Sequence, residues 1–169
     1  SLLSLGLLCV FALDRPNAEL LIRTLIGNDN EQLCSLLVQR TEGTPLFIEE
    51  TVRAQIEDGV LRGDRGAYQL TRELQSIRLP DSVQAVLASR IDRLDLAQRE
   101  LLQTASVIGI DVSLALLEQV ADVARDRLRP LLADLQAADF LYQVPNTASD
   151  QFKFRHALTH EVAYGGLLS

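Results

Sequence analysis

A chain of 169 residues with 47% apolar and 23% charged residues can bury a sizeable core, as one domain or as two small ones. This composition excludes a disordered chain, and the formal net charge of −7 argues against a surface built for nucleic-acid phosphates or anionic membranes. The two cysteines, Cys9 and Cys34, lie in different contexts and form no disulfide framework or metal motif, so we expect a reducing, cytoplasmic setting.

The beginning of the sequence suggests that the chain is part of a longer protein. It contains no methionine, even at position 1. The apolar run from Leu2 to Leu13 is too short to span a bilayer and has no Lys or Arg before it. We therefore expect residues 1–13 to be the remnant of an upstream domain, as a buried strand or helix.

Two helices are predicted next, joined by a short loop that favours antiparallel neighbours. The first begins at the turn Asp14-Arg15-Pro16-Asn17 and ends at Gly27-Asn28-Asp29-Asn30, and the second spans about Glu31 to Arg40. Their predicted apolar faces are Leu20, Leu21, Thr24 and Leu25 in the first helix, and Leu33, Leu36 and Leu37 in the second.

A third helix opens at residues 40–50, the stretch RTEGTPLFIEE, and is expected to end at Gly59. Gly43 can take a positive φ, Thr44 is a candidate N-cap, and Pro45 stands at the first helical position. A helix start does not require a glycine two residues before a proline. This corner therefore presents backbone N–H groups and a flat ring without a donor to whatever lies beside it.

Residues 59–70 predict a β-hairpin around the turn Gly63-Asp64-Arg65-Gly66. Residues 71–79 lack periodicity and predict a linker that ends at Pro80. A strong helix should follow, capped by Asp81 with Gln84 at the capping-box position. Its apolar stripe is predicted to consist of Val83, Val86, Leu87, Ile91 and Leu94.

The rest of the chain predicts three helices, a hairpin and a last helix. The three helices lie near 97–108, from Asp111 or Ser113 to Val120, and at 124–138; the third either begins near Arg127 or kinks at Pro130. Two strands at 140–144 and 151–155 are joined by residues 145–150, and the final helix starts at His156. This order is typical of a winged helix. We expect a mainly α fold, with a helical bundle and hairpin at 14–79 and a winged-helix domain at 80–169.

Few residues suggest chemistry. Phosphate-binding loops of the P-loop or Rossmann type are absent, so any phosphate cradle would lie upstream of Ser1. His156 and His160 have a spacing that zinc sites use, but Glu161 follows the second histidine and no third ligand is apparent, so we expect no metal site. His156 lies at a strand-to-helix junction, where its imidazole either donates to a phosphate oxygen or simply fills the junction.

The charged runs favour solvent-facing helices. We expect Glu49-Glu50 and Glu57-Asp58 to form the solvated side of an amphipathic helix instead of a catalytic carboxylate pair. A basic recognition helix would need a face of positive charge, and here basic and acidic side chains alternate along the helix. The residues concerned are Arg125, Arg127 and Arg129 with Asp126, Asp134 and Asp139.

Four segments, in the expected order, resemble one bacterial family, the STAND-type AAA-related signalling ATPase module. This module often follows a class III adenylate or guanylate cyclase domain or lies in large transcriptional regulators. The resemblance covers about Asp14 to the C-terminus, and it includes only the helical lid and the winged helix of the module, without its ATPase core. The segments are Arg40–Glu50, Leu79–Leu87, Leu101–Gly109 and Phe154–Tyr164.

The resemblance implies a nucleotide site. In that family a Gly-x-Pro corner lies against the adenine, which corresponds here to Gly43 and Pro45, and a winged-helix histidine contacts the phosphates of ADP, which corresponds to His156. The chain departs from the family in two places: Thr44 stands where asparagine is common, and Ala157 follows the histidine where plant immune members have aspartate. ATP or ADP, with Mg, would be held mainly by the missing core.

The function implied is that of a regulatory fragment of an ATP/ADP-switched signal-transduction ATPase, closing over nucleotide and controlling a nucleotide cyclase. The fragment alone is expected to catalyse nothing, while the parent protein hydrolyses or cyclises ATP. The implied partners are nucleotide, the upstream core and cyclase domain of the same chain, and downstream helical repeats, with residues 70–79 as a candidate hinge. Two alternatives stay open: a DNA-binding winged-helix transcriptional regulator, and a plain helical interaction module.

Overall fold

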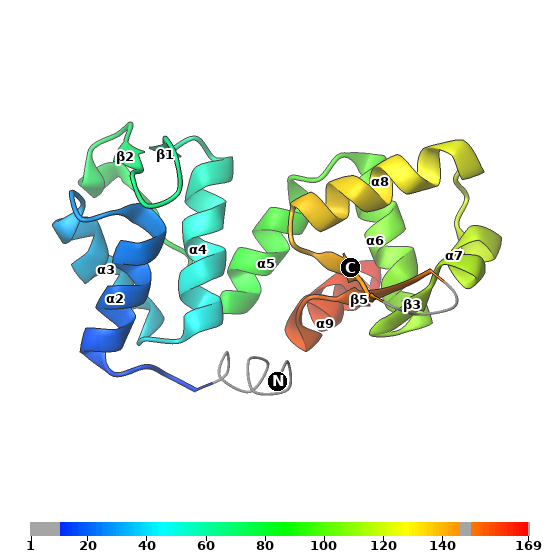
Figure 1. Cartoon of the computed structure of the whole chain (residues 1–169), viewed down its shortest axis with the longest axis horizontal. Helices are drawn as coiled ribbons and strands as arrows, with labels where there is room; N and C mark the ends of the chain where they lie inside the picture. Colours follow the sequence, from blue (N-terminus) through cyan, green and yellow to red (C-terminus); the bar gives the residue numbers. More distant parts are fainter. Residues whose placement is uncertain (1–10, 146–149, 169) are drawn as a thin grey trace. The chain divides into compact units, whose positions relative to one another are not determined.

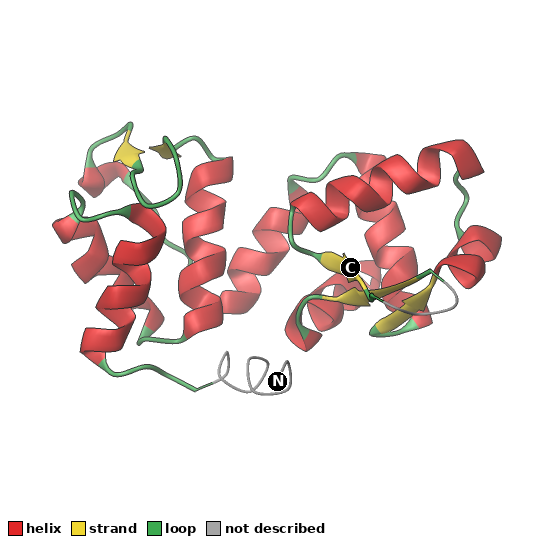
Figure 2. Cartoon of the chain, in the orientation of Figure 1, coloured by secondary structure: helices red, strands yellow, loops and turns green. Residues whose placement is uncertain are grey.

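The computed structural model describes residues 11–145 and 150–168. The chain divides into two compact units, Ser1–Val86 and Leu87–Ser169, and each is described by itself. Helices dominate both units, with strands confined to a hairpin in the first and a small sheet in the second (Figures 1 and 2). This confirms the prediction of a mainly α chain. Of the expected upstream remnant 1–13, residues 1–10 lie outside the described residues.

The first unit is a bundle of helices with a hairpin. The first helix begins at the predicted turn, where Asp14 is its N-cap: the carboxylate accepts a hydrogen bond from the Asn17 N–H at 3.0 Å. Strands β1 and β2 are antiparallel, with Leu61 opposite Leu70, which confirms the hairpin. The elements are α2 (Arg15–Ile26), α3 (Glu31–Thr41), α4 (Pro45–Glu57), β1 (Leu61–Arg62), β2 (Gln69–Leu70), the 3₁₀ helix η1 (Leu74–Ser76) and the start of α5 (Val83–Asp92).

The core of this unit corrects the face predicted for α2. Leu20 is 64% exposed and Thr24 is exposed, whereas Leu21 and Leu25 are half-buried. A second stripe with helical spacing is buried instead, and it carries a small side chain that lets α3 and α4 approach. The buried core residues are Ala18, Ile22, Ile26, Leu33, Cys34, Leu37, Ile48, Val52, Leu61 and Leu79.

The segment that leads to α5 corrects two further predictions. Leu74 and Ile77 pack against the core and Leu79 is buried, so residues 71–79 are not a free linker. The cap of α5 is not Asp81, because the Ser82 hydroxyl accepts the Ala85 N–H at 3.1 Å. Both residue types are good caps, and Asp81 is instead drawn into an ion pair with Arg40 at 2.7 Å.

The second unit packs helices on a three-stranded antiparallel sheet with β5 in the middle. Val112 and Leu141 lie opposite Phe152 and Phe154, respectively. Strand β3 was not predicted, and the helix expected from Asp111 or Ser113 begins one residue later. The elements after α5 are α6 (Leu96–Ile108), β3 (Asp111–Ser113), α7 (Leu114–Val120), α8 (Arg125–Ala137), β4 (Leu141–Gln143), β5 (Gln151–Phe154), α9 (Ala157–Gly165) and the 3₁₀ helix η2 (Gly166–Leu168).

Helix α8 begins at Arg125, so Pro130 lies inside the helix and not in its first turn. The first of the two alternatives for this helix is therefore wrong. The proline is exposed, where the carbonyl that loses its partner can be hydrated. Of the expected loop 145–150, residues 146–149 lie outside the described part of the chain.

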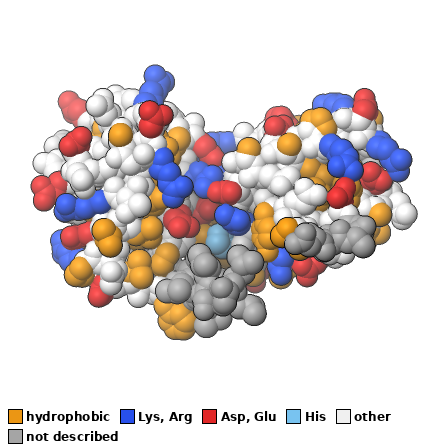
Figure 3. All heavy atoms as spheres, viewed as in Figure 1, with side chains coloured by type: hydrophobic (Ala, Val, Ile, Leu, Met, Phe, Trp, Pro, Cys, Tyr) orange, Lys and Arg blue, Asp and Glu red, His pale blue; other side chains and the backbone are white. Residues whose placement is uncertain are grey.

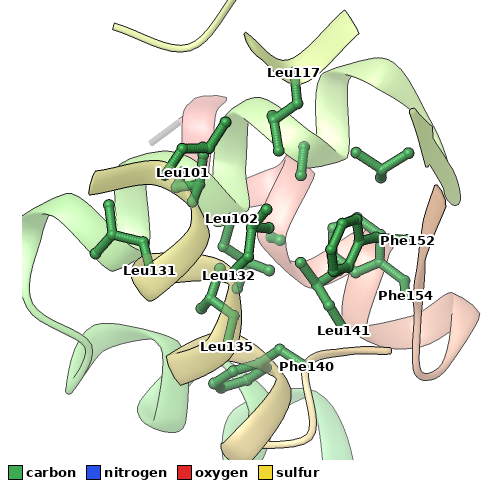
Figure 4. Packing of buried hydrophobic residues seen from close by; sticks show 14 of the residues in the cluster. Leu101, Leu102, Leu117, Leu131, Leu132, Leu135, Phe140, Leu141, Phe152 and Phe154 are labelled. Carbon is green, nitrogen blue, oxygen red and sulfur yellow. The ribbon is translucent and has the colours of Figure 1, made fainter. Parts of the chain in front are cut away.

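Figure 4 shows the core of the second unit, where leucines of α6, α7 and α8 meet the aromatic rings of the sheet side. Phe140, Phe152 and Phe154 are 1%, 5% and 2% exposed. The stripe predicted for α5 is largely confirmed, since Val86, Leu87 and Ile91 are buried. No described helix has both the length and the apolar character needed to cross a membrane.

Candidate functional site

The Gly43 corner is formed by a close approach of backbone to backbone. Gly43 adopts φ +76°, as predicted, and its carbonyl accepts the Leu13 N–H at 2.8 Å. A Cβ at Gly43 would collide with the Leu13 carbonyl oxygen. The chain that enters α2 therefore passes directly over this glycine. Packing within this unit is enough to explain why a glycine stands at position 43.

Pro45 begins α4, as predicted, and the preceding Thr44 occupies the N-cap position without a side-chain capping bond. The N–H groups of the first turn are thus not satisfied by the Thr44 hydroxyl. Gly43 and Pro45 are both buried. A ligand can reach the backbone at Gly43 only after the chain at Leu13 has moved aside.

A polar pocket of about 430 Å³ adjoins the corner. It is bordered by Leu36, Gln39 and the Arg40–Asp81 ion pair, and Glu42 connects it to Gly43. Glu42 has φ +51°, a left-handed conformation that ends α3. Gly43 and Pro45 themselves do not line this pocket.

His156 lies in the second unit, directly before α9. It occupies the N-cap position with φ −138°, and its half-buried imidazole makes no hydrogen bond within the described part of the chain. Burial lowers the pKa of His156, the neighbouring Arg155 lowers it further, and the Asp139 carboxylate opposes both effects. At neutral pH the ring is therefore uncharged, with one N–H to donate and one nitrogen to accept.

His160 has a structural environment. Its Nε2 lies 2.8 Å from the Ser106 carbonyl oxygen, and its ring meets the edge of Phe154 at a centroid distance of 5.2 Å. The Tyr164 ring stacks on the other side at 6.4 Å. Among the described residues no group of three or more metal-ligating side chains forms. The two histidines of the i, i+4 pair thus have separate surroundings.

Arg90 is a residue that the sequence analysis missed. It is 1% exposed, donates to the Ala138 carbonyl oxygen at 2.7 Å, and lies 4.6 Å above the centre of the Phe140 ring. The turn it holds contains Asp139, with φ +60°, the carboxylate that also acts on His156. One signal was visible, because position 90 falls on the apolar stripe of α5, three residues after Leu87.

Gly43 and Pro45 belong to the first unit and His156 to the second, and each is described within its own unit. Comparisons with protein families, curated proteins and solved structures find no match. The functional assignment therefore depends on the sequence resemblance and on the local geometry of each unit.

Proposed function

We propose that this chain is the lid and winged-helix part of an ATP/ADP-switched signalling ATPase of the STAND type, with nucleotide and Mg held mainly by a core outside the chain. The observation that carries the proposal is His156, whose half-buried, uncharged imidazole has no hydrogen-bond partner among the described residues. A ring nitrogen without a protein partner is available to a ligand that supplies one.

The element order of the second unit supports a winged helix. The chain runs α6, β3, α7, α8, β4, β5, with β5 paired to both other strands. The antiparallel pair β4 and β5 would then be the two strands of the wing. Strand β3, which was not predicted, supports this assignment. It pairs with β5 and so extends the predicted two-stranded hairpin to a three-stranded sheet.

In the proposed switch, His156 donates its N–H to a phosphate oxygen of ADP in the inactive state. The start of α9 contributes unpaired N–H groups and the positive end of its dipole, and Arg155 adds positive charge beside the ring. Gly43 and Pro45 would contact the adenine once the chain above Gly43 moves away. The packing of residues 71–79 on the first core argues against this segment as the hinge.

The proposal places catalysis elsewhere in the parent protein and assigns no catalytic residue to this chain. A cyclase domain and an ATPase core upstream, and helical repeats downstream, are the partners it implies. Cytoplasmic localisation follows from the nucleotide switch and not from the fold.

DNA binding by the second unit is the less favoured function. Arg125 pairs with Glu118 at 2.9 Å and Arg129 with Asp150 at 3.0 Å, so two arginines of α8 face carboxylates. On the face drawn in Figure 3, basic and acidic side chains are intermixed instead of forming a field of one sign. Such a surface offers little of the counterion release that drives binding to duplex DNA.

The test is ADP affinity of the parent protein that includes its P-loop core. His156→Ala should weaken ADP binding by about ten- to a hundredfold, the value of one hydrogen bond to a charged phosphate oxygen. His160→Gln is the matched control, because it changes the neighbouring histidine while keeping a donor near the Ser106 carbonyl, and it should leave the affinity unchanged. Equal ADP affinity in the wild type and His156→Ala would remove His156 from the site.

A further inference from the structure

A second pocket, of about 360 Å³, lies wholly within the first unit. The C-terminal end of α4 forms one wall and the segment after the hairpin forms the other. Val60 and Ile77 give it an apolar base, while its polar rim carries Gln55, Arg72 and Arg78. The volume falls within the range of small-molecule sites.

Gln55 is the unusual residue of this pocket. It is only 5% exposed, and although its backbone carbonyl accepts the Val60 N–H at 2.9 Å, its side-chain amide has no hydrogen-bond partner among the described residues. Among the described residues, the side-chain atom that is both fully enclosed and without a hydrogen-bond partner is Thr51 Oγ1. The Gln55 amide is therefore not fully enclosed. Solvent therefore still reaches that amide, and the pocket is the opening that it borders.

Arg72 and Arg78 supply positive charge on the opposite wall. Both are exposed, and neither forms an ion pair within the described residues. The segment that carries the two arginines is held on the unit. The Ser76 hydroxyl donates to the Glu73 carbonyl at 2.7 Å, and Ile77 and Leu79 pack on the core. Guanidinium groups bind carboxylate or phosphate groups through charge-assisted, often bidentate, hydrogen bonds.

We propose that this pocket binds a small molecule through an oxyanion group, a carboxylate or a phosphate. The guanidinium groups of Arg72 and Arg78 hold the oxygens, and the Gln55 amide donates from the buried side. Asp58 adds one negative charge to the same rim, which favours a singly charged group over a polyanion. This inference is independent of the nucleotide switch and would give the fragment an effector site of its own.

The experiment is a titration of the ¹⁵N-labelled 169-residue chain, followed by the side-chain amide signals of Gln55. Sodium succinate, sodium phosphate and ADP are the probes, with sodium chloride at matched ionic strength as the blank. We expect a saturable shift with succinate or phosphate. The better of these two probes identifies a carboxylate or a phosphate, and tighter binding of ADP than of phosphate identifies a nucleotide as the source.

Two double variants separate a built site from a general charge effect. Arg72→Gln/Arg78→Gln should weaken binding at least tenfold. Arg62→Gln/Arg65→Gln removes the same charge from the exposed hairpin and should leave binding unchanged. Equal losses in both variants, or no saturable shift with any probe, would overturn the proposal.

Gln55→Leu tests the buried amide separately. Because an unpaired amide is replaced by an apolar side chain of similar size, the urea midpoint of the free chain should rise while the affinity for the probe falls. A lower midpoint would mean that the amide already has a structural partner, and the proposal would then be wrong.

Discussion

In the first unit backbone atoms approach each other closely at several glycines, whereas the second unit buries large aromatic side chains. Gly43 lies under the Leu13 carbonyl, and a Cβ at Gly27 would come within 2.5 Å of the Gly66 carbonyl oxygen. In the second unit a Cβ at Gly109 or Gly165 would meet nothing closer than 3.7 Å, and a Cβ at Gly166 would meet only the end of the Gln103 side chain, at 3.2 Å. This unit instead buries three phenylalanines and one arginine.

This difference predicts opposite sensitivities. The first unit should tolerate the loss of a methyl group better than the addition of one at its glycines, because the added atom meets backbone that cannot rotate away. The second unit should be most sensitive to the loss of ring volume, because a rigid aromatic core leaves a cavity that its neighbours cannot fill.

The largest effect should come from Phe140→Ala in the second unit. The ring is 1% exposed and lies under the Arg90 guanidinium, so its removal creates a cavity and leaves a buried charge without its aromatic contact. We expect a loss of about 3–5 kcal/mol in urea denaturation followed by circular dichroism. Leu96→Ala, at a side chain 62% exposed, is the control and should change stability by less than about 0.5 kcal/mol. A small loss for Phe140→Ala would contradict the proposed contrast between the units.

Arg90→Ala should follow, with a loss of about 3 kcal/mol, because it opens a cavity and leaves the Ala138 carbonyl without its donor. Arg90→Met keeps most of the side-chain volume and should be less destabilising. The same urea measurement then divides the effect: equal losses in the two variants would show that the lost hydrogen bonds dominate and that packing contributes little.

Gly43→Ala tests the first unit and should cost about 2 kcal/mol, because it combines a positive φ with a collision against the Leu13 carbonyl. Gly165→Ala is the control in the second unit, where a Cβ meets nothing within 4 Å inside α9. There alanine should stabilise by about 0.5–1 kcal/mol. If both substitutions shift the thermal midpoint in the same direction, the backbone explanation for the first unit fails.

The helix caps of the first unit offer a smaller comparison. Asp14→Ala removes a formed capping bond and should cost about 1 kcal/mol. Thr44→Ala removes a hydroxyl that makes no such bond and should cost less than about 0.5 kcal/mol. The two values are measured in the same urea experiment, and a larger loss for Thr44→Ala would mean that its hydroxyl has another role.

The smallest effect concerns pH. Because burial lowers the pKa of His156, the unfolded chain binds a proton that the folded chain does not when the pH falls below the ordinary histidine pKa of about 6.5. The stabilising contribution is present above that pH and is lost as the pH falls through the lower folded pKa. His156→Gln should therefore lose part of the decrease in stability between about pH 7 and pH 5 that the wild type shows. An unchanged pH dependence would show that burial does not act on this ring.

The sequence predicted the elements whose signals are local. The helix start at the turn 14–17, the positive φ of Gly43 and the hairpin at 59–70 each depend on neighbours within a few residues, and all three are confirmed. Strand β3 was missed because three residues show no alternation, and they become a strand only by pairing with β5, about forty residues later in the chain.

The errors share a long-range cause. Asp81 is of a residue type that caps helices well, but its carboxylate forms an ion pair with Arg40, which is far away in sequence. The face of α2 was ambiguous because two stripes had helical spacing, and only the helices packed against it decide which is buried. Buried polar residues contradict the pattern that locates the core, so Arg90 and Gln55 were missed, and Glu50, expected on the solvated side of its helix, is only 4% exposed. For the candidate site, the conformation of Gly43 and the place of His156 before α9 were predictable, but the burial of Pro45 was not.

The buried thiol of Cys34 allows the opening of the first unit to be followed by chemical labelling. It is 3% exposed, and burial raises its pKa, so alkylating reagents should react with it only when the helices around it separate. Residues 87–169 contain no cysteine. After Cys9→Ser, the rate of thiol labelling in native buffer would therefore time the opening of the first unit alone, without any added dye or tag.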